Sequence, residues 1–164
     1  MRATPGSLEV VWALGRDRSG HAILELSFVL PVLLVIACGI GDVAMGFTKR
    51  LVVQQAAARA LEMTLAKGFG STSEATARTE AATAAGVEES RVTATAWLEC
   101  GGTKQVGVDA VSGTCAVGAG APTRYLSVTV TDTYSSSLGP MLALLKAGNW
   151  SAVPLTGYAV VRVQ

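Results

Sequence analysis

A single carboxylate, Glu25, stands inside an apolar run that extends from Ala22 to Gly41. An ionised carboxylate is costly in an apolar environment, so a charge retained there points to a counter-charge or a function. Gly20 and His21 directly precede the run, and Glu25 is the fifth residue after Gly20. Gly20, His21 and Glu25 are therefore the first candidates for a functional site.

The run itself is long enough to cross a membrane. As a helix, its 20 residues would extend for roughly 30 Å, which matches the hydrocarbon core of a bilayer. No small-x-small site follows it, which disfavours a cleavable secretory signal. A lipoprotein with a modified Cys38 is the alternative, but it would require a long leader containing Glu25. Pro31 removes a backbone donor and is expected to kink this transmembrane segment.

Two further cysteines, Cys100 and Cys115, enclose a Gly-rich segment without metal-type spacing. A disulfide between them would stabilise the fold by about 3 kcal/mol on a chain-entropy model, and two free thiols are the alternative. Positive charges on the two sides of the run are nearly balanced, so they do not decide its orientation. Because a disulfide persists in an oxidising compartment, the cysteines favour an exported C-terminal part.

Helical periodicity continues beyond the run, and we expect one helix over about residues 21–67. Small and apolar residues recur along one side, and polar residues occupy the other. The buried side is predicted to contain Val53, Ala57, Ala60, Leu61 and Thr64, and the exposed side Gln55, Arg59 and Glu62. Because the buried stripe is rich in alanine, this helix can approach a sheet closely.

A second, shorter helix is predicted over residues 73–85. Gly68 and Gly70 end the first helix, and Gly86 ends the second. Ser71 and Glu74 have the spacing of a capping box, in which each side chain accepts a hydrogen bond from the other residue's backbone amide. We therefore expect this pair to start the second helix.

Three segments then alternate apolar and polar residues with the period of a strand: residues 92–98, 126–130 and 159–163. They predict an antiparallel sheet with one apolar and one Thr-rich face, and hence an α+β fold of roughly three strands under a long N-terminal helix. Leu138 to Leu145, around Pro140, predict a short crossover helix that covers the core. A subunit or membrane contact is the alternative for this segment.

Composition argues against several classes of function. The net charge is +1 and no stretch concentrates Lys and Arg, so no nucleic-acid partner is expected. The only histidine is His21, which excludes Ser-His-Asp and Cys-His catalytic arrangements in the exported part. We expect no metal, cofactor or enzymatic activity, because no ligand spacing or phosphate loop is present. The other notable carboxylates are interpreted as surface charges: Glu88, Glu89, Asp109 and Asp132.

Several short segments of the N-terminal part follow one another in a fixed order. They are Arg16-Asp17-Arg18-Ser19-Gly20, Ala22-Ile23-Leu24-Glu25-Leu26, Leu30-Pro31, Gly39-Ile40-Gly41-Asp42 and Gln54-Gln55-Ala56-Ala57-Ala58-Arg59-Ala60. In this order and spacing they resemble the TadE-like proteins, pseudopilins of the tight-adherence (Tad/Flp) pilus. The resemblance covers residues 16–67 and, loosely, the closing strand from Gly157 to Val163. It implies a pilin-like fold.

The resemblance also implies processing by a prepilin peptidase at the cytoplasmic membrane face, after Gly20. His21 would become the N-terminus, and Glu25 its fifth residue. An α-ammonium of an adjacent subunit would be the counter-charge of Glu25 and would set the axial register during assembly. The domains implied are a cytoplasmic leader (1–20), a transmembrane segment (21–41), an amphipathic continuation (42–67) and an exported α+β domain (68–164).

The function implied is that of a minor pilin or pseudopilin of a Tad-type (type IVb-like) pilus, because major subunits of such pili are much shorter. It would serve pilus biogenesis, adhesion and secretion, in the inner (cytoplasmic) membrane or in the filament. Its partners would be the prepilin peptidase, other pilin or pseudopilin subunits and the inner-membrane assembly platform. The alternative is an uncleaved or Cys38-lipidated single-span protein whose exported domain binds an envelope partner.

Overall fold

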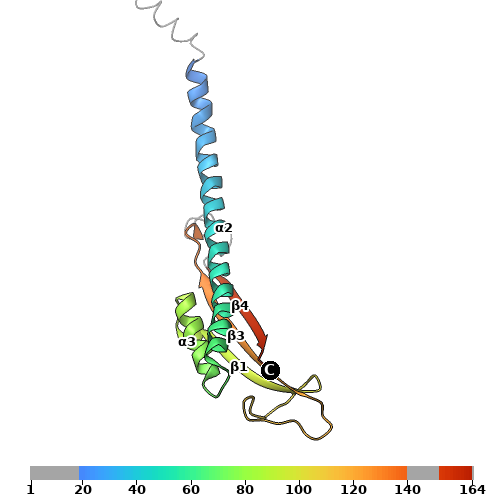
Figure 1. Ribbon diagram of the computed structural model, residues 1–164. Helices are drawn as coiled ribbons and strands as arrows, with labels where there is room; N and C mark the ends of the chain where they lie inside the picture. Colours follow the sequence, from blue (N-terminus) through green and yellow to red (C-terminus); the bar gives the residue numbers. More distant parts are fainter. Residues whose placement is uncertain (1–18, 140–151, 164) are drawn as a thin grey trace, which may run out of the picture. The chain divides into compact units, whose positions relative to one another are not determined.

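The computed structural model describes residues 19–139 and 152–163, without the side chains of 19–22 (Figure 1). The chain divides into two compact units, Met1–Gly41 and Asp42–Gln164. In order, the elements are helix α2 (Ser19–Lys67), helix α3 (Ser73–Ala85), the 3-10 helix η1 (Glu89–Arg91), and strands β1 (Val92–Cys100), β2 (Thr103–Lys104), β3 (Pro122–Tyr134) and β4 (Val153–Arg162). Helix α3 has the predicted bounds, and α2 ends at Lys67 as predicted but is already helical at Ser19, two residues before the predicted start.

The four strands form one antiparallel sheet in the order β2-β1-β3-β4. In the middle of the sheet, Val128 of β3 lies opposite Ala94 of β1 and Ala159 of β4. The predicted α+β class is therefore confirmed, and the expected three strands are joined by β2. That strand has two residues, too few to produce a recognisable alternation in the sequence.

The core lies between the apolar face of the sheet and two helices, α3 and the second half of α2 (Figure 1). The predicted stripe of α2 is confirmed, because all five of its residues are buried: Val53, Ala57, Ala60, Leu61 and Thr64. The sheet contributes Val92, Ala94, Leu126, Val128 and Val130, and α3 contributes Ala77, Ala81, Ala82 and Ala85. Small side chains on both helices let the helix backbones lie close to the sheet.

Gly157 in β4 marks the closest approach between α2 and the sheet. A Cβ atom at this position would overlap the carbonyl oxygen of Val53 and would lie 2.9 Å from the backbone nitrogen of Gln54. Both obstacles are backbone atoms, which cannot rotate away. The close packing of α2 on β4 therefore requires glycine at position 157.

Side chains from the helices cover parts of both sheet edges. On β4, the Gln54 amide donates to the carbonyl of Tyr158 at 2.8 Å, and its oxygen accepts from the Tyr158 amide at 3.2 Å. On β1, the Glu74 carboxylate accepts a hydrogen bond of 2.6 Å from the amide of Ala96. These side chains satisfy strand groups that have no strand beside them.

The predicted capping box of Ser71 with Glu74 is wrong. The residue before α3 is Thr72, which makes no side-chain capping hydrogen bond. The Glu74 carboxylate instead accepts a hydrogen bond from the Ala96 amide of β1, because this amide has no strand beside it and would be costly to leave unpaired. The C-terminal end is as expected, with Gly86 in the left-handed region at φ 67°.

The predicted crossover helix around Pro140 lies almost entirely outside the described residues, which resume at Ala152. Leu138 and Gly139 are the parts of this segment that the structure describes, and Ser135 to Ser137 separate them from the end of β3. Its predicted role in covering the core, and the alternative of a subunit or membrane contact, both remain predictions.

Candidate functional site

Glu25 lies on a helix whose apolar side chains face solvent. Every side chain from Ile23 to Cys38 is exposed, and Phe28 reaches 78% exposure. Over the two described ranges of the chain, Glu25 makes no hydrogen bond or ion pair. An apolar surface of this extent is characteristic of a segment that contacts lipid or another protein. The Glu25 carboxylate therefore lies on the surface that lipid or another protein would cover.

One helix among the described residues, over Ile23–Lys67, is long and apolar enough to cross a membrane. Its mean hydropathy is 2.5 over an 18-residue window, and none of that window is buried. The backbone of Gly20 and His21 belongs to the first turn of α2. The candidate cleavage point and Glu25 therefore share one continuous helix.

Two other predicted features lie on the same stretch of α2. Pro31 is inside the helix, and the kink that it should cause remains a prediction. Cys38 is a free and exposed cysteine. A side chain in the spanning run has no protein core around it, and this accounts for the exposure.

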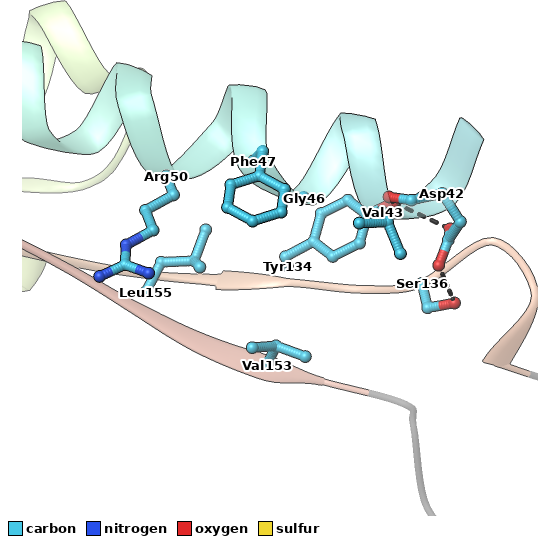
Figure 2. A pocket seen from close by; sticks show the side chains of 9 residues that line it. All are labelled: Asp42, Val43, Gly46, Phe47, Arg50, Tyr134, Ser136, Val153 and Leu155. Atoms are coloured by element: carbon cyan, nitrogen blue, oxygen red, sulfur yellow. Dashed lines mark hydrogen bonds between the residues drawn. The ribbon is translucent and has the colours of Figure 1, made fainter. Parts of the chain in front are cut away.

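The first residue of the second unit, Asp42, accepts hydrogen bonds from the last residue of β3 and from the turn that follows it. Its carboxylate accepts from the Ser136 hydroxyl at 2.6 Å, the Tyr134 hydroxyl at 2.9 Å and the Ser137 amide at 2.9 Å (Figure 2). The Ser136 hydrogen bond is the main cause that lowers the pKa of Asp42. Desolvation opposes this lowering, and the bonds from Tyr134 and Ser137 reinforce it.

Tyr134 links this cluster to α2 by packing as well as by hydrogen bonding. Its ring lies over Gly46, where an added Cβ atom would be 3.4 Å from the ring. Desolvation, followed by the neighbouring Asp42 carboxylate, raises the pKa of Tyr134. The phenol therefore remains a neutral donor to Asp42 over the physiological pH range.

Sequence reasoning did not single out this cluster. The available signals were an acidic residue directly after the apolar run and the polar group Tyr134-Ser135-Ser136-Ser137 at the end of a strand. No local pattern connects residues that are 92 positions apart in the chain, as Asp42 and Tyr134 are.

A pocket of about 230 Å³ adjoins the cluster between α2, β3 and β4. Figure 2 shows Asp42 and Ser136 at one end and the guanidinium of Arg50 at the other. The walls between these polar ends are formed by Val43, Gly46, Phe47, Tyr134, Val153 and Leu155. The pocket is thus apolar along its length and cationic at one end.

The other predicted site, the Cys100–Cys115 disulfide, is present, with Cα atoms 5.7 Å apart. Asp109 organises the loop by accepting hydrogen bonds from the amides of Val111 and Ser112, at 2.9 and 2.6 Å. The bond from the Ser112 amide is the largest of the hydrogen-bond effects that together lower the pKa of Asp109. The Arg124 guanidinium donates to the carbonyl of Ala110 at 2.9 Å. Asp109 is thus a structural surface carboxylate.

The carboxylates of the remaining candidates do not assemble into a metal centre. Asp132 pairs with Arg91 at 3.0 Å, and Glu88 and Glu89 are exposed. Across residues 19–139 and 152–163, no group of three or more His, Cys, Asp or Glu residues has an arrangement able to hold a metal ion.

An exposed apolar helix that continues into a small α+β domain defines a class of protein with an N-terminal candidate membrane anchor. Within this class, the family model described as TadE-like protein matches residues 20–61, and the resemblance found in the sequence is thereby confirmed. The match covers most of α2, including Gly20, His21 and Glu25, and suggests a Tad pilus-associated protein. No curated protein and no solved structure matches the chain significantly.

Proposed function

We propose that this protein is a minor pilin or pseudopilin of a Tad-type, type IVb-like pilus. The observation that carries the proposal is Glu25, a carboxylate without a partner among the described residues, which lies on an exposed apolar helix five residues after Gly20. The family-model match over residues 20–61 supports the assignment to a Tad system. The role is structural, in pilus biogenesis and thereby in adhesion and secretion, and no enzymatic chemistry is assigned to the chain.

In the proposed pathway, α2 inserts into the inner membrane with residues 1–20 in the cytoplasm and the domain after Gly41 exported. A prepilin peptidase then cleaves after Gly20, so that His21 carries the new α-ammonium group. The disulfide between Cys100 and Cys115 supports the exported location, because disulfides persist in oxidising compartments. The assembly platform of the inner membrane receives the processed subunit.

During assembly, the Glu25 carboxylate pairs with the α-ammonium of a neighbouring pilin subunit. Exposed apolar side chains around Glu25, such as Leu24 and Phe28, then pack against the neighbouring helix. Removing water from both charges is costly unless they meet, so only one axial offset between the helices is favourable. Glu25 thus selects the register of the subunit.

The N-terminus of the protein recovered from membranes tests the processing step. We expect Edman sequencing and intact mass to show a chain that begins at His21 in cells with an active prepilin peptidase. Recovery of the unprocessed chain from those cells would contradict the pilin assignment. A diacylated Cys38 would instead establish the lipidated anchor, for which this exposed cysteine is the available attachment point.

The register step is tested by Glu25→Ala, with Ser27→Ala as the matched control. Ser27 is also exposed on α2, but its hydroxyl donates a hydrogen bond of 2.7 Å to the Leu24 carbonyl of the same helix. Glu25→Ala should insert and be processed normally but fail to co-purify with other pilins, because an ammonium buried without its partner costs roughly 3 to 5 kcal/mol. Ser27→Ala should assemble normally. Assembly of Glu25→Ala at the wild-type level would refute the register mechanism.

A further inference from the structure

We propose that the pocket between α2, β3 and β4 binds an anionic glycerophospholipid of the membrane that α2 spans. The phosphate would lie at Arg50, and the upper part of an acyl chain would follow Val43 and Phe47. This inference uses the membrane insertion contained in the proposed function, but not the processing or the assembly.

The shape and lining of the pocket fit an amphiphile. Its volume of about 230 Å³ accommodates several methylene groups, and its walls are apolar between two polar ends. Val43 and Phe47 remain 59% and 61% exposed although they belong to the folded unit that begins at Asp42. A hydrocarbon chain in the pocket would cover apolar surface that the described residues leave open.

The charges around the pocket favour an anionic ligand. Arg50 is exposed and makes no ion pair within the described ranges. Asp42 is the only acidic residue among the described residues that line the pocket, and three donors from the end of β3 and the turn after it already occupy its carboxylate. A second cavity, which Tyr134 also lines, is bounded by Met45, Val52 and the cationic Lys49. Arg50 is therefore the basic side chain that the described residues place at the proposed pocket, since Lys49 lines the second cavity.

The position along α2 agrees with the depth of a lipid headgroup. Asp42 directly follows the apolar run, and the helix rises by ~1.5 Å per residue, so Arg50 lies roughly 12 Å beyond Asp42 along the helix. The headgroup layer on one side of a bilayer is roughly 5 to 8 Å thick, and the exposed Arg50 side chain, which extends away from Asp42 in Figure 2, would turn toward Asp42 to bridge the remaining distance. From a phosphate at Arg50, the acyl chain would pass Phe47 and then Val43, in the direction of the run.

The experiment is native mass spectrometry of the full chain released from nanodiscs that contain equal amounts of phosphatidylcholine and phosphatidylglycerol. Wild-type protein should retain phosphatidylglycerol in preference to phosphatidylcholine. Arg50→Gln should reduce the retained phosphatidylglycerol about fivefold, because one basic side chain near an anionic surface contributes about 1 kcal/mol. Arg59→Gln is the matched control, since Arg59 is exposed on the same helix but lines neither cavity.

A second variant tests the pocket without changing its charge. Val153→Trp, at the start of β4, should fill the pocket and reduce lipid retention while Arg50 remains in place. Equal effects of Arg50→Gln and Arg59→Gln, or full retention by Val153→Trp, would overturn the proposal in favour of general surface attraction. Dimers without lipid adducts would overturn it as well and assign the pocket to a second copy of the chain.

These outcomes are separable from failure of the pilin assignment. A chain that is never processed, or that never joins a filament, would still retain phosphatidylglycerol in nanodiscs if the pocket binds it. A chain that does not enter nanodiscs at all would contradict the membrane anchor itself, and with it both proposals.

Discussion

The two halves of α2 differ in whether the protein's own core buries their apolar side chains. From Ile23 to Cys38 all side chains are exposed, although this half contains the more hydrophobic residues of the helix. In the second half, Ala57 and Ala60 are fully buried, although alanine is only weakly hydrophobic. The more hydrophobic half of α2 is therefore the less buried one, and the less hydrophobic half forms part of the core.

The difference shows that the halves are stabilised by different surroundings. The second half gains its stability from the sheet and α3, because its small residues permit close backbone contact. The first half has no such contacts among the described residues of its unit, so we expect its stabilisation to come from lipid or from other subunits. Substitutions in the second half should change folding, and those in the first half should change insertion or assembly.

The strongest contrast is expected from the same substitution in both regions, Gly157→Ala and Gly39→Ala. A Cβ at position 157 meets backbone atoms of Val53 and Gln54, whereas one at position 39 meets nothing within 4 Å. Gly157→Ala should lower the free energy of unfolding by at least about 3 kcal/mol, the upper end of the usual cost of overpacking. Gly39→Ala should leave it unchanged. Denaturant unfolding of the full chain in detergent measures both, and equal stabilities would contradict the close-packing account.

Loss of the disulfide should have the next largest effect. Replacing Cys100 and Cys115 by serine should destabilise the second unit by up to about 3 kcal/mol, because the unfolded chain gains conformational freedom. Membrane fractionation should be unaffected, since α2 and its apolar run are unchanged. Cys38→Ser is the control and should alter neither the unfolding transition nor the non-reducing peptide map. A wild-type unfolding curve after loss of the disulfide would show that other contacts hold the loop.

A smaller effect is expected from Gln54→Ala, which removes both hydrogen bonds to the β4 edge at Tyr158. We expect a loss of about 1 kcal/mol in the free energy of unfolding and a greater tendency to aggregate through the exposed strand edge. Gln55→Ala is the control, because Gln55 is exposed on the other side of α2. Thermal unfolding combined with light scattering distinguishes the two variants. Identical behaviour would mean that the β4 edge needs no cover.

The smallest effect is a change in acid sensitivity from Asp42→Asn. Because hydrogen bonds led by that from Ser136 lower the pKa of Asp42 in the folded state, its contribution is fully present above the unfolded pKa and disappears as pH falls through the folded value. Wild-type stability should therefore fall below about pH 4, and Asp42→Asn should reduce this dependence. Asp109 behaves in the same way, so part of the dependence should remain. An unchanged acid profile would exclude a contribution from Asp42.

The elements that the sequence predicted correctly are those with a regular period. Helix α2, helix α3 and the inward residues of β1 and β3 follow from spacing alone, because an amphipathic element must place its apolar side on the core. The pairing of Cys100 with Cys115 was also predictable, since the two cysteines enclose one loop and Cys38 lies in the apolar run.

The features that escaped prediction depend on residues far apart in the chain. Ser71 and Glu74 have the spacing of a capping box, but Glu74 instead satisfies the Ala96 amide, 22 residues away. The hydrogen bonds of Asp42 with Tyr134 and Ser136, and the pocket beside them, arise only when β3 lies along α2. Sequence spacing carries no information about such contacts until the topology is known.

The alanine-rich core has a consequence for the thermodynamics of folding. Burying an alanine restricts no side-chain rotamer, so α3 and the buried stripe of α2 join the core with little entropic cost. Each alanine also removes little apolar surface from water, so the favourable contribution per residue is small. The free energy that stabilises a core of this kind is therefore the sum of many small contributions. Its heat capacity of unfolding should accordingly be low for its length, with a broad and shallow dependence of stability on temperature.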